Sequence, residues 1–427
     1  MLYNKRIFLT LITIFALALA SFGQVSKSPF STFGIGDLYG TSLAQNQGMG
    51  GLGLSNPSSW YINNQNPALL VFNYVTSVQA GLLVEKRTIN DGSNALKNTS
   101  GNLNYIAMAF PVKPGKWTTS IGLMPYSSVN YKLSSVQSVS GNTSSSVLSQ
   151  ETGSGGINQF YWSNGVRLHK NISVGMKASY LFSSIIKEDI NVLNKGDNRV
   201  VTFYPSIYER NYVKDFALSG GFSFHKDSLF KKNYRLSVGV VYDVKSTLNT
   251  RNTLRIERRS ITGVIIDSTT TINNVPSTIV LPQSYGAGIS FGRVNHWVAG
   301  ADVTFLDYAQ FRGFNGNTPP TTMGIHSAVG LEVIPDPTSI GSYLKRMTYR
   351  TGVSYDRYPY LVNGNEVKDF GVNFGVSLPV GQLSTIDLAL KVGKRGNLAE
   401  NTIDENYFKL YFGMTFNDRW FIKRKFD

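Results

Sequence analysis

The sequence contains no cysteine, so neither a disulfide bond nor a lipid attached through a cysteine is available to the protein. Charged residues are scarce as well, at 16% of 427 residues where about a quarter is usual. The four histidines form neither a His-Glu-x-x-His motif nor a paired spacing for a metal ion. We therefore expect no metal, no cofactor and no enzymatic activity.

Long hydrophobic runs are also missing, apart from one at the start of the chain. Lys5 and Arg6 precede an apolar run of 14 residues, and small residues up to Gly23 follow it. This pattern predicts a signal peptide over residues 1–23 and hence an exported protein. The net charge of +15 then suits anionic lipid headgroups, and we expect no nucleic-acid partner because Lys and Arg form no runs.

Aromatic residues and glycine are abundant, and from about residue 75 apolar and polar side chains alternate. The segment YFKLYFGMTF at 407–416 is typical: every second residue is apolar, from Phe408 to Phe416. A period of two predicts a strand with one apolar and one polar face. The polar faces carry charges that a lumen would pair or use to attract an anionic head group: Arg235, Asp302, Glu332, Arg350, Asp387, Lys391 and Lys409.

About fourteen such segments follow one another, joined alternately by short and long connections. The longer connections fall near 134–155, 188–209, 252–279 and 307–322. This predicts an all-β fold over residues 75–427: a 14-stranded antiparallel outer-membrane β-barrel with periplasmic turns and long extracellular loops. The alternative is a secreted array of β-sandwiches.

The stretch NQGMGGLGLSNPSSW contains Gly48, Gly50 and Gly53 in a G-x-G-x-x-G spacing. A dinucleotide site needs a strand before this motif and a helix after it, and the sequence offers neither. Residues 24–74 precede the first predicted strand and are rich in Gly, Asn, Ser and Pro. We expect them to form a plug inside the lumen, where glycine allows close backbone packing and positive φ.

The same stretch resembles the N-terminal hatch of the FadL-like (OmpP1/FadL/TodX) outer-membrane transporters, with an Asn-Pro-Ala element at Asn66, Pro67 and Ala68. LPQSYGAGISF (281–291), WVAGADVTFLDYAQF (297–311) and YRTGVSYDRYPY (349–360) resemble later strands of that family, in the same order. The segments 28–38 and 419–426 resemble its Bacteroidota members, a branch that includes PorV-like barrels of protein secretion.

The resemblance implies functional roles for several residues. Pro125, midway along the third predicted strand, would kink this strand and open a lateral exit; the alternative is a bulge of no consequence. The Asn-Pro-Ala element would belong to a movable hatch; the alternative is a permanently seated plug. Apolar residues of the plug would line a ligand pocket or serve as buried packing: Phe33, Leu52, Leu54, Trp60 and Leu69.

These observations predict a channel of the Gram-negative outer membrane for passive uptake of small hydrophobic molecules, such as long-chain fatty acids or aromatics. Its partners would be outer-membrane lipid, lipopolysaccharide and the hydrophobic ligand. The alternative is a non-transporting barrel: an accessory or scaffold subunit of an outer-membrane secretion or assembly machine, contacting a protein partner through extracellular loops.

Overall fold

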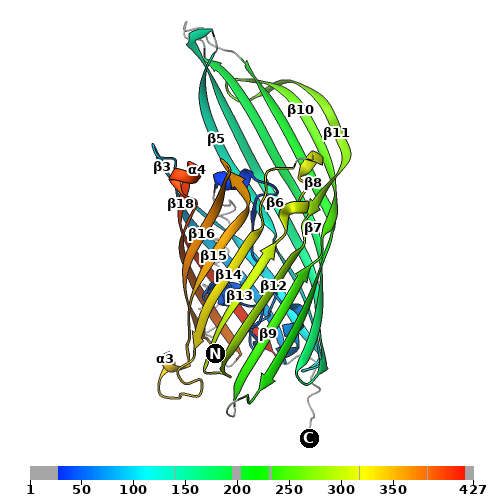
Figure 1. Cartoon of the computed structure of the whole chain (residues 1–427), viewed down its shortest axis with the longest axis vertical. Helices are drawn as coiled ribbons and strands as arrows, with labels where there is room; N and C mark the ends of the chain where they lie inside the picture. Colours follow the sequence, from blue (N-terminus) through cyan, green and yellow to red (C-terminus); the bar gives the residue numbers. More distant parts are fainter. Residues whose placement is uncertain are drawn as a thin grey trace, which may run out of the picture.

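The computed structural model describes residues 27–139, 141–194, 203–229, 233–316, 318–381 and 383–418. The predicted signal peptide, residues 1–23, lies outside the described residues. Within the described part, no helix has both the length and the apolar character needed to cross a bilayer. Strands dominate the rest of the chain (Figure 1).

One antiparallel sheet closes into a barrel, because the last strand pairs with the first wall strand from Asp404↔Asn90 to Asp418↔Thr76. The wall strands are β2 (Thr76–Asn90), β3 (Ala95–Lys113), β4 (Trp117–Pro125), β5 (Ser127–Val139), β6 (Asn142–His169), β7 (Ile172–Asn194), β8 (Phe203–Asp227), β9 (Tyr234–Asp243), β10 (Ser246–Ser260), β11 (Ile265–Leu281), β12 (Ser284–Arg293), β13 (Trp297–Leu306), β14 (Gly324–Val333), β15 (Thr348–Val362), β16 (Asn365–Pro379), β17 (Ser384–Arg395) and β18 (Asp404–Asp418).

In three places, two strands that follow each other in the sequence form one wall strand with a short interruption. β4 and β5 both pair with β6, and β9 and β10 both pair with β8. β11 and β12 continue each other, pairing with β10 and β9 respectively. Counted this way the wall has fourteen strands, as the alternation predicted.

The apolar faces point outward. On β18 the aromatic rings of Phe408 and Phe416 are 45% and 42% exposed, whereas Tyr407, Tyr411 and Thr415 on the other face are buried. Backbone groups in hydrocarbon must be paired, and closure of the sheet achieves this without an open edge at membrane depth. The pattern and the fold are those of an outer-membrane barrel.

Residues 27–75 precede the wall and contain short elements: η1 (Pro29–Thr32), β1 (Asp37–Leu38), α2 (Ala44–Gln47) and η2 (Pro67–Phe72). We call these residues the N-terminal segment. Side chains or backbone groups of β7, β8, β13, β16 and β18 hydrogen-bond to it. A chain that bonds to strands all around a closed wall lies in the lumen, as Figure 1 also shows.

The expected long loops at one end of the barrel are largely strand. Most of 134–155, 188–209 and 252–279 belongs to extended parts of β5–β8, β10 and β11, whereas 307–322 is irregular apart from η3 (Tyr308–Gln310) and η4 (Phe314–Gly316). These extended strands have polar residues on both faces, so the apolar alternation that reveals a strand in lipid is absent. The remaining helices are α3 (Tyr343–Arg346) and α4 (Leu398–Asn401).

The extended strands pair in the order β5-β6-β7-β8-β10-β11. They rise on one side of the barrel only, above the level at which the other strands end (Figure 1). We call this open sheet the wall extension. It stands at the end opposite the short turns of residues 114–116, 170–171 and 294–296, which we assign to the periplasmic side.

Candidate functional site: the filled lumen and the wall gap

The third wall strand is broken where the sequence places Pro125. β4 ends at this proline, and β3 pairs with β4 only as far as Ile106↔Leu123. Beyond the break, β5 pairs with β6 on one side, and no pairing with β3 is found among the described residues. The wall therefore has a gap between the outer halves of β3 and β5, in keeping with a proline that cannot donate a ladder hydrogen bond.

The N-terminal segment occupies the β5 side of this gap. β1 pairs with β5 through Asp37↔Ser128 and Leu38↔Ser127, and the Tyr39 N–H donates to the Tyr126 carbonyl at 2.9 Å. On the β3 side, the Asn102 amide donates to the Tyr39 hydroxyl at 3.0 Å. Burial, with nearby carboxylates, raises the pKa of Tyr39, so this hydroxyl stays neutral and the segment bridges both edges.

The Asn-Pro-Ala element begins η2. The Asn66 side chain accepts from the Ala68 N–H at 3.0 Å, capping the helix, and donates to the Leu54 carbonyl at 2.8 Å and to the Phe222 carbonyl of β8 at 3.1 Å. Pro67 follows at the first helical position, where its missing N–H costs nothing. All three residues are buried, and the element is tied both to its own segment and to the wall.

Glycines on both sides allow this close fit. A Cβ on Gly175 of β7 would lie 2.4 Å from the Pro67 carbonyl carbon, and one on Gly221 of β8 would lie 2.3 Å from the Asn66 Oδ1. In the segment, Gly50 has φ +76° and its position would put a Cβ 2.5 Å from the Val353 carbonyl oxygen of β15. The G-x-G-x-x-G stretch therefore serves close packing against the wall, as expected.

Asp302 of β13 anchors the turn that follows this glycine stretch. Its Oδ2 accepts from the Gly53 and Leu54 N–H groups, each at 2.7 Å, and its Oδ1 accepts from the Ser55 hydroxyl at 3.3 Å. Hydrogen bonds to an ionised acceptor are about twice as strong as neutral ones. One carboxylate thus fixes three consecutive residues of the N-terminal segment to the wall.

The other charges predicted for the lumen form several separate pairs. Arg350 reaches Glu332 at 2.6 Å and Asp387 at 3.9 Å, which brings three of the predicted residues together. The remaining three each find a different partner: Lys391–Asp356 at 3.8 Å, Lys409–Glu85 at 3.8 Å and Arg235–Asp227 at 2.5 Å. The last pair lies at the more exposed periplasmic end of β8 and β9, away from the others.

A buried cluster near η1 was not anticipated from the sequence. Arg395 contacts Asp37 of β1 at 2.9 Å, and Arg87 contacts Glu405 at 2.6 Å. The Ser28 hydroxyl donates to the same Glu405 at 2.7 Å. The two arginines sit on polar faces of alternating strands, which is a signal for the lumen, but their pairing with residues some 300 positions away depends on barrel closure.

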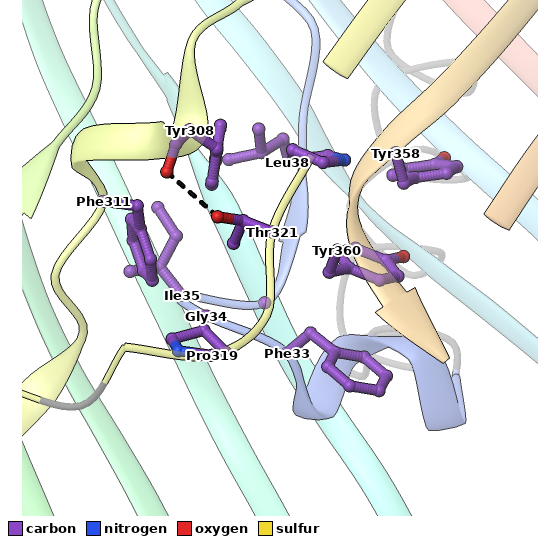
Figure 2. A pocket seen from close by; sticks show the side chains of 12 residues that line it. Phe33, Gly34, Ile35, Leu38, Tyr308, Phe311, Pro319, Thr321, Tyr358 and Tyr360 are labelled. Carbon is purple, nitrogen blue, oxygen red and sulfur yellow. Dashed lines mark hydrogen bonds between the residues drawn. The ribbon is translucent and has the colours of Figure 1, made fainter. Parts of the chain in front are cut away.

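The apolar residues expected to line a pocket lie in different places. Phe33 stacks on Tyr360 with ring centroids 4.7 Å apart, beside a cavity of only about 20 Å³ (Figure 2). Trp60 lines a larger cavity of about 740 Å³ that is bordered by turns of the periplasmic end. Leu52 and Leu69 are fully buried in two separate clusters, and Leu54 is buried near the wall. The pocket role of these residues stays a prediction.

The family profile of BamG matches residues 3–427, nearly the whole sequence. The chain belongs to the BamG family. None of the curated proteins matches this BamG-family chain in sequence.

Several solved structures share the fold of this chain. The toluene transporter TodX of P. putida is 15% identical, with a TM-score of 0.55 over 90% of this chain and 100% of that one. The CymD monoaromatic hydrocarbon channel is 13% identical, with a TM-score of 0.55 over 88% of this chain and 98% of that one. A FadL homologue of Pseudomonas aeruginosa is 12% identical, with a TM-score of 0.54 over 89% and 98%.

At these identities the likeness establishes the fold. The BamG-family chain has the fold of the FadL-like outer-membrane barrels, which confirms the fold predicted from the sequence. Two of these structural neighbours are named as a monoaromatic hydrocarbon channel and a toluene transporter.

Proposed function

We propose that this protein is a sealed barrel that acts as an accessory or scaffold subunit of an outer-membrane protein secretion or assembly machine. The observation that carries the proposal is the way the N-terminal segment is fixed in the lumen. A hatch that admits substrate must leave its seat, and this segment is held by buried polar contacts on many strands.

The strength of that seat follows from the contacts. Asp302 accepts three hydrogen bonds from the segment, Asn66 donates to β8, and Arg395 pairs with Asp37. A buried hydrogen bond contributes about 1 kcal/mol net, and one to a charged group about 1.5–3 kcal/mol. Moving the whole segment would forgo several of these at once, which favours a permanently seated plug.

The wall extension supports the same proposal. β8 has 25 residues, which at about 3.3 Å per residue is about 80 Å of strand. With a tilt of about 40°, such a strand rises about 60 Å, whereas the apolar band of an outer-membrane barrel is about 25 Å tall. A rigid sheet that stands far above the membrane on one side provides a surface for a protein partner.

Purification in mild detergent tests the proposal directly. The protein is extracted from its native membrane and isolated by an affinity tag, and the mass of the isolated species is measured by native mass spectrometry. A stoichiometric protein partner that stays bound is the expected result. Isolation of the bare barrel under several mild detergents, together with a lipid-like molecule in its lumen, would contradict it.

The second candidate is passive uptake of a small hydrophobic molecule, and the gap between β3 and β5 is the observation that favours it. TodX and CymD, which share the fold, are named for toluene and monoaromatic hydrocarbon transport. In this candidate Pro125 keeps the gap open and residues near Tyr39 move aside. Uptake of labelled fatty acid or toluene by cells with wild-type protein and with Pro125→Val decides it: equal uptake in both removes the gate.

A further inference from the structure

The outer strand of the wall extension has a free edge. β11 pairs with β10 from Ser246↔Leu281 to Arg259↔Ile265. On its other side, the described residues provide only one bridge, Val280↔Arg312, near the base of the strand. In 265–275 all residues but Ile272 are exposed. Within the described part of the chain, the backbone N–H and C=O groups of this stretch that point away from β10 have no neighbouring strand.

Most protein sheets protect such an edge with lysine, proline, a bulge or a short strand. The sequence IIDSTTTIN at 265–273 has one charged residue, Asp267, and no lysine or proline. Two bulges interrupt the ladder within this stretch, between Ile265 and Asp267 and between Thr270 and Ile272. Lower down, Asn274 has φ +55° and Pro276 cannot donate a hydrogen bond. Residues 265–273 are rich in Thr and Ile and therefore offer an edge with high strand propensity, whose regular part is Asp267–Thr270.

Apolar side chains gather at the same end of the strand. The turn between β10 and β11 and the start of β11 carry four exposed aliphatic residues: Ile261 at 61%, Val264 at 63%, Ile265 at 48% and Ile266 at 51% exposure. This end of β8 and β10 lies well above the height of a typical apolar band of about 25 Å. Lipid therefore does not cover these residues, and an exposed apolar group beside a free edge marks an interaction site.

We propose that an extended segment of the partner protein adds to the sheet by pairing with residues 265–273 of β11. The inference rests on the scaffold function proposed above and names the surface it uses. Only a polypeptide strand presents hydrogen-bond donors and acceptors at the spacing of a strand edge, so the ligand of this edge is an extended polypeptide. Apolar side chains near one end of the added segment would cover Ile265 and Ile266.

A second copy of this chain fits the edge poorly. Barrel strands tilt by about 35–45° from the membrane normal, and two copies in one membrane would be related by a twofold axis along that normal. Their two β11 strands would then cross at about twice the tilt, roughly 80°, and could not form a ladder. A flexible segment of another protein has no such constraint.

Hydrogen exchange on the purified complex tests the proposal. The amides of residues 265–273 that point away from β10 should exchange at least ten-fold more slowly in the complex than in the barrel alone, because the added strand protects them. Residues 131–138 on β5, the opposite edge of the wall extension, serve as the internal control and should not change. Equal exchange of 265–273 in the two samples overturns the proposal, and so does a complex whose only members are copies of this chain.

A matched pair of variants separates this inference from the scaffold function. Thr269→Lys with Thr270→Lys places one lysine on each face of the edge strand and should reduce partner recovery at least ten-fold. Ser135→Lys with Val136→Lys does the same on β5 and should leave recovery unchanged. If wild-type protein has no partner, the scaffold function fails; if the partner remains on the β11 variant, only the docking site fails.

Discussion

Two adjacent glycines of β8 provide a sensitive test of how firmly the N-terminal segment is seated. A Cβ on Gly221 would lie 2.3 Å from the Asn66 Oδ1 and 2.8 Å from the Pro67 Cδ, whereas a Cβ on Gly220 meets no atom within 4 Å. We therefore compare Gly221→Ala with Gly220→Ala. Both variants replace a strand glycine by alanine, so the intrinsic effect on the strand cancels.

The expected cost follows from what Asn66 does. Its side chain makes hydrogen bonds to Ala68, Leu54 and Phe222, so it cannot simply rotate away from the new methyl group. Overpacking costs about 1–3 kcal/mol, and loosening a neutral hydrogen bond costs about 1 kcal/mol. We expect Gly221→Ala to lower the free energy of local opening around η2 by about 2–4 kcal/mol, and Gly220→Ala to leave it unchanged.

Thiol labelling measures this opening cleanly, because the natural sequence contains no cysteine. Leu69→Cys places a single thiol at a fully buried position of η2. At a tenfold change per 1.4 kcal/mol, Gly221→Ala should accelerate maleimide labelling of this thiol by about 30- to 1000-fold over the Gly220→Ala background. Equal labelling rates in the two backgrounds would refute the packing of η2 against β8.

Three further changes test other contacts. Asp302→Ala should speed hydrogen exchange at residues 53–55 by at least about 100-fold, since two buried N–H groups lose a charged acceptor worth about 1.5–3 kcal/mol each. Asp267→Ala in the wall extension is the control, and no difference between the two variants would contradict the anchor. Arg395→Gln should expose residues 28–39 to protease, because Asp37 loses the buried Arg395 as a partner. Substitution of the exposed Arg251 by Gln is the control and should leave these residues protected. Equal protection in the two variants would show that the Arg395–Asp37 ion pair does not hold the segment. The folded chain should need detergent to remain monodisperse, as light scattering would show, since Phe408, Phe416 and similar side chains point outward; a monodisperse sample in plain buffer would contradict the membrane location.

Local pattern was sufficient for the membrane-embedded part of the protein. Strands in lipid need an apolar side chain at every second position, so the alternation near Phe408 and Phe416 revealed both the strand and its orientation. Pro125 likewise marked a break in its ladder, because the missing N–H acts locally. The glycines around Gly50 likewise predicted a close backbone contact, because the absence of a side chain also acts locally.

The wall extension and the contacts of the lumen depended on the tertiary structure. Strands with water on both sides carry no alternation, so residues 252–279, which form the outer parts of β10 and β11, were predicted to be a loop. Arg395 and Asp37, or Asp302 and Gly53, are far apart in sequence and meet only because the sheet closes around the N-terminal segment. The sequence by itself determined which faces meet lipid, because solvent acts on each residue separately; which residues meet each other was decided by closure of the barrel.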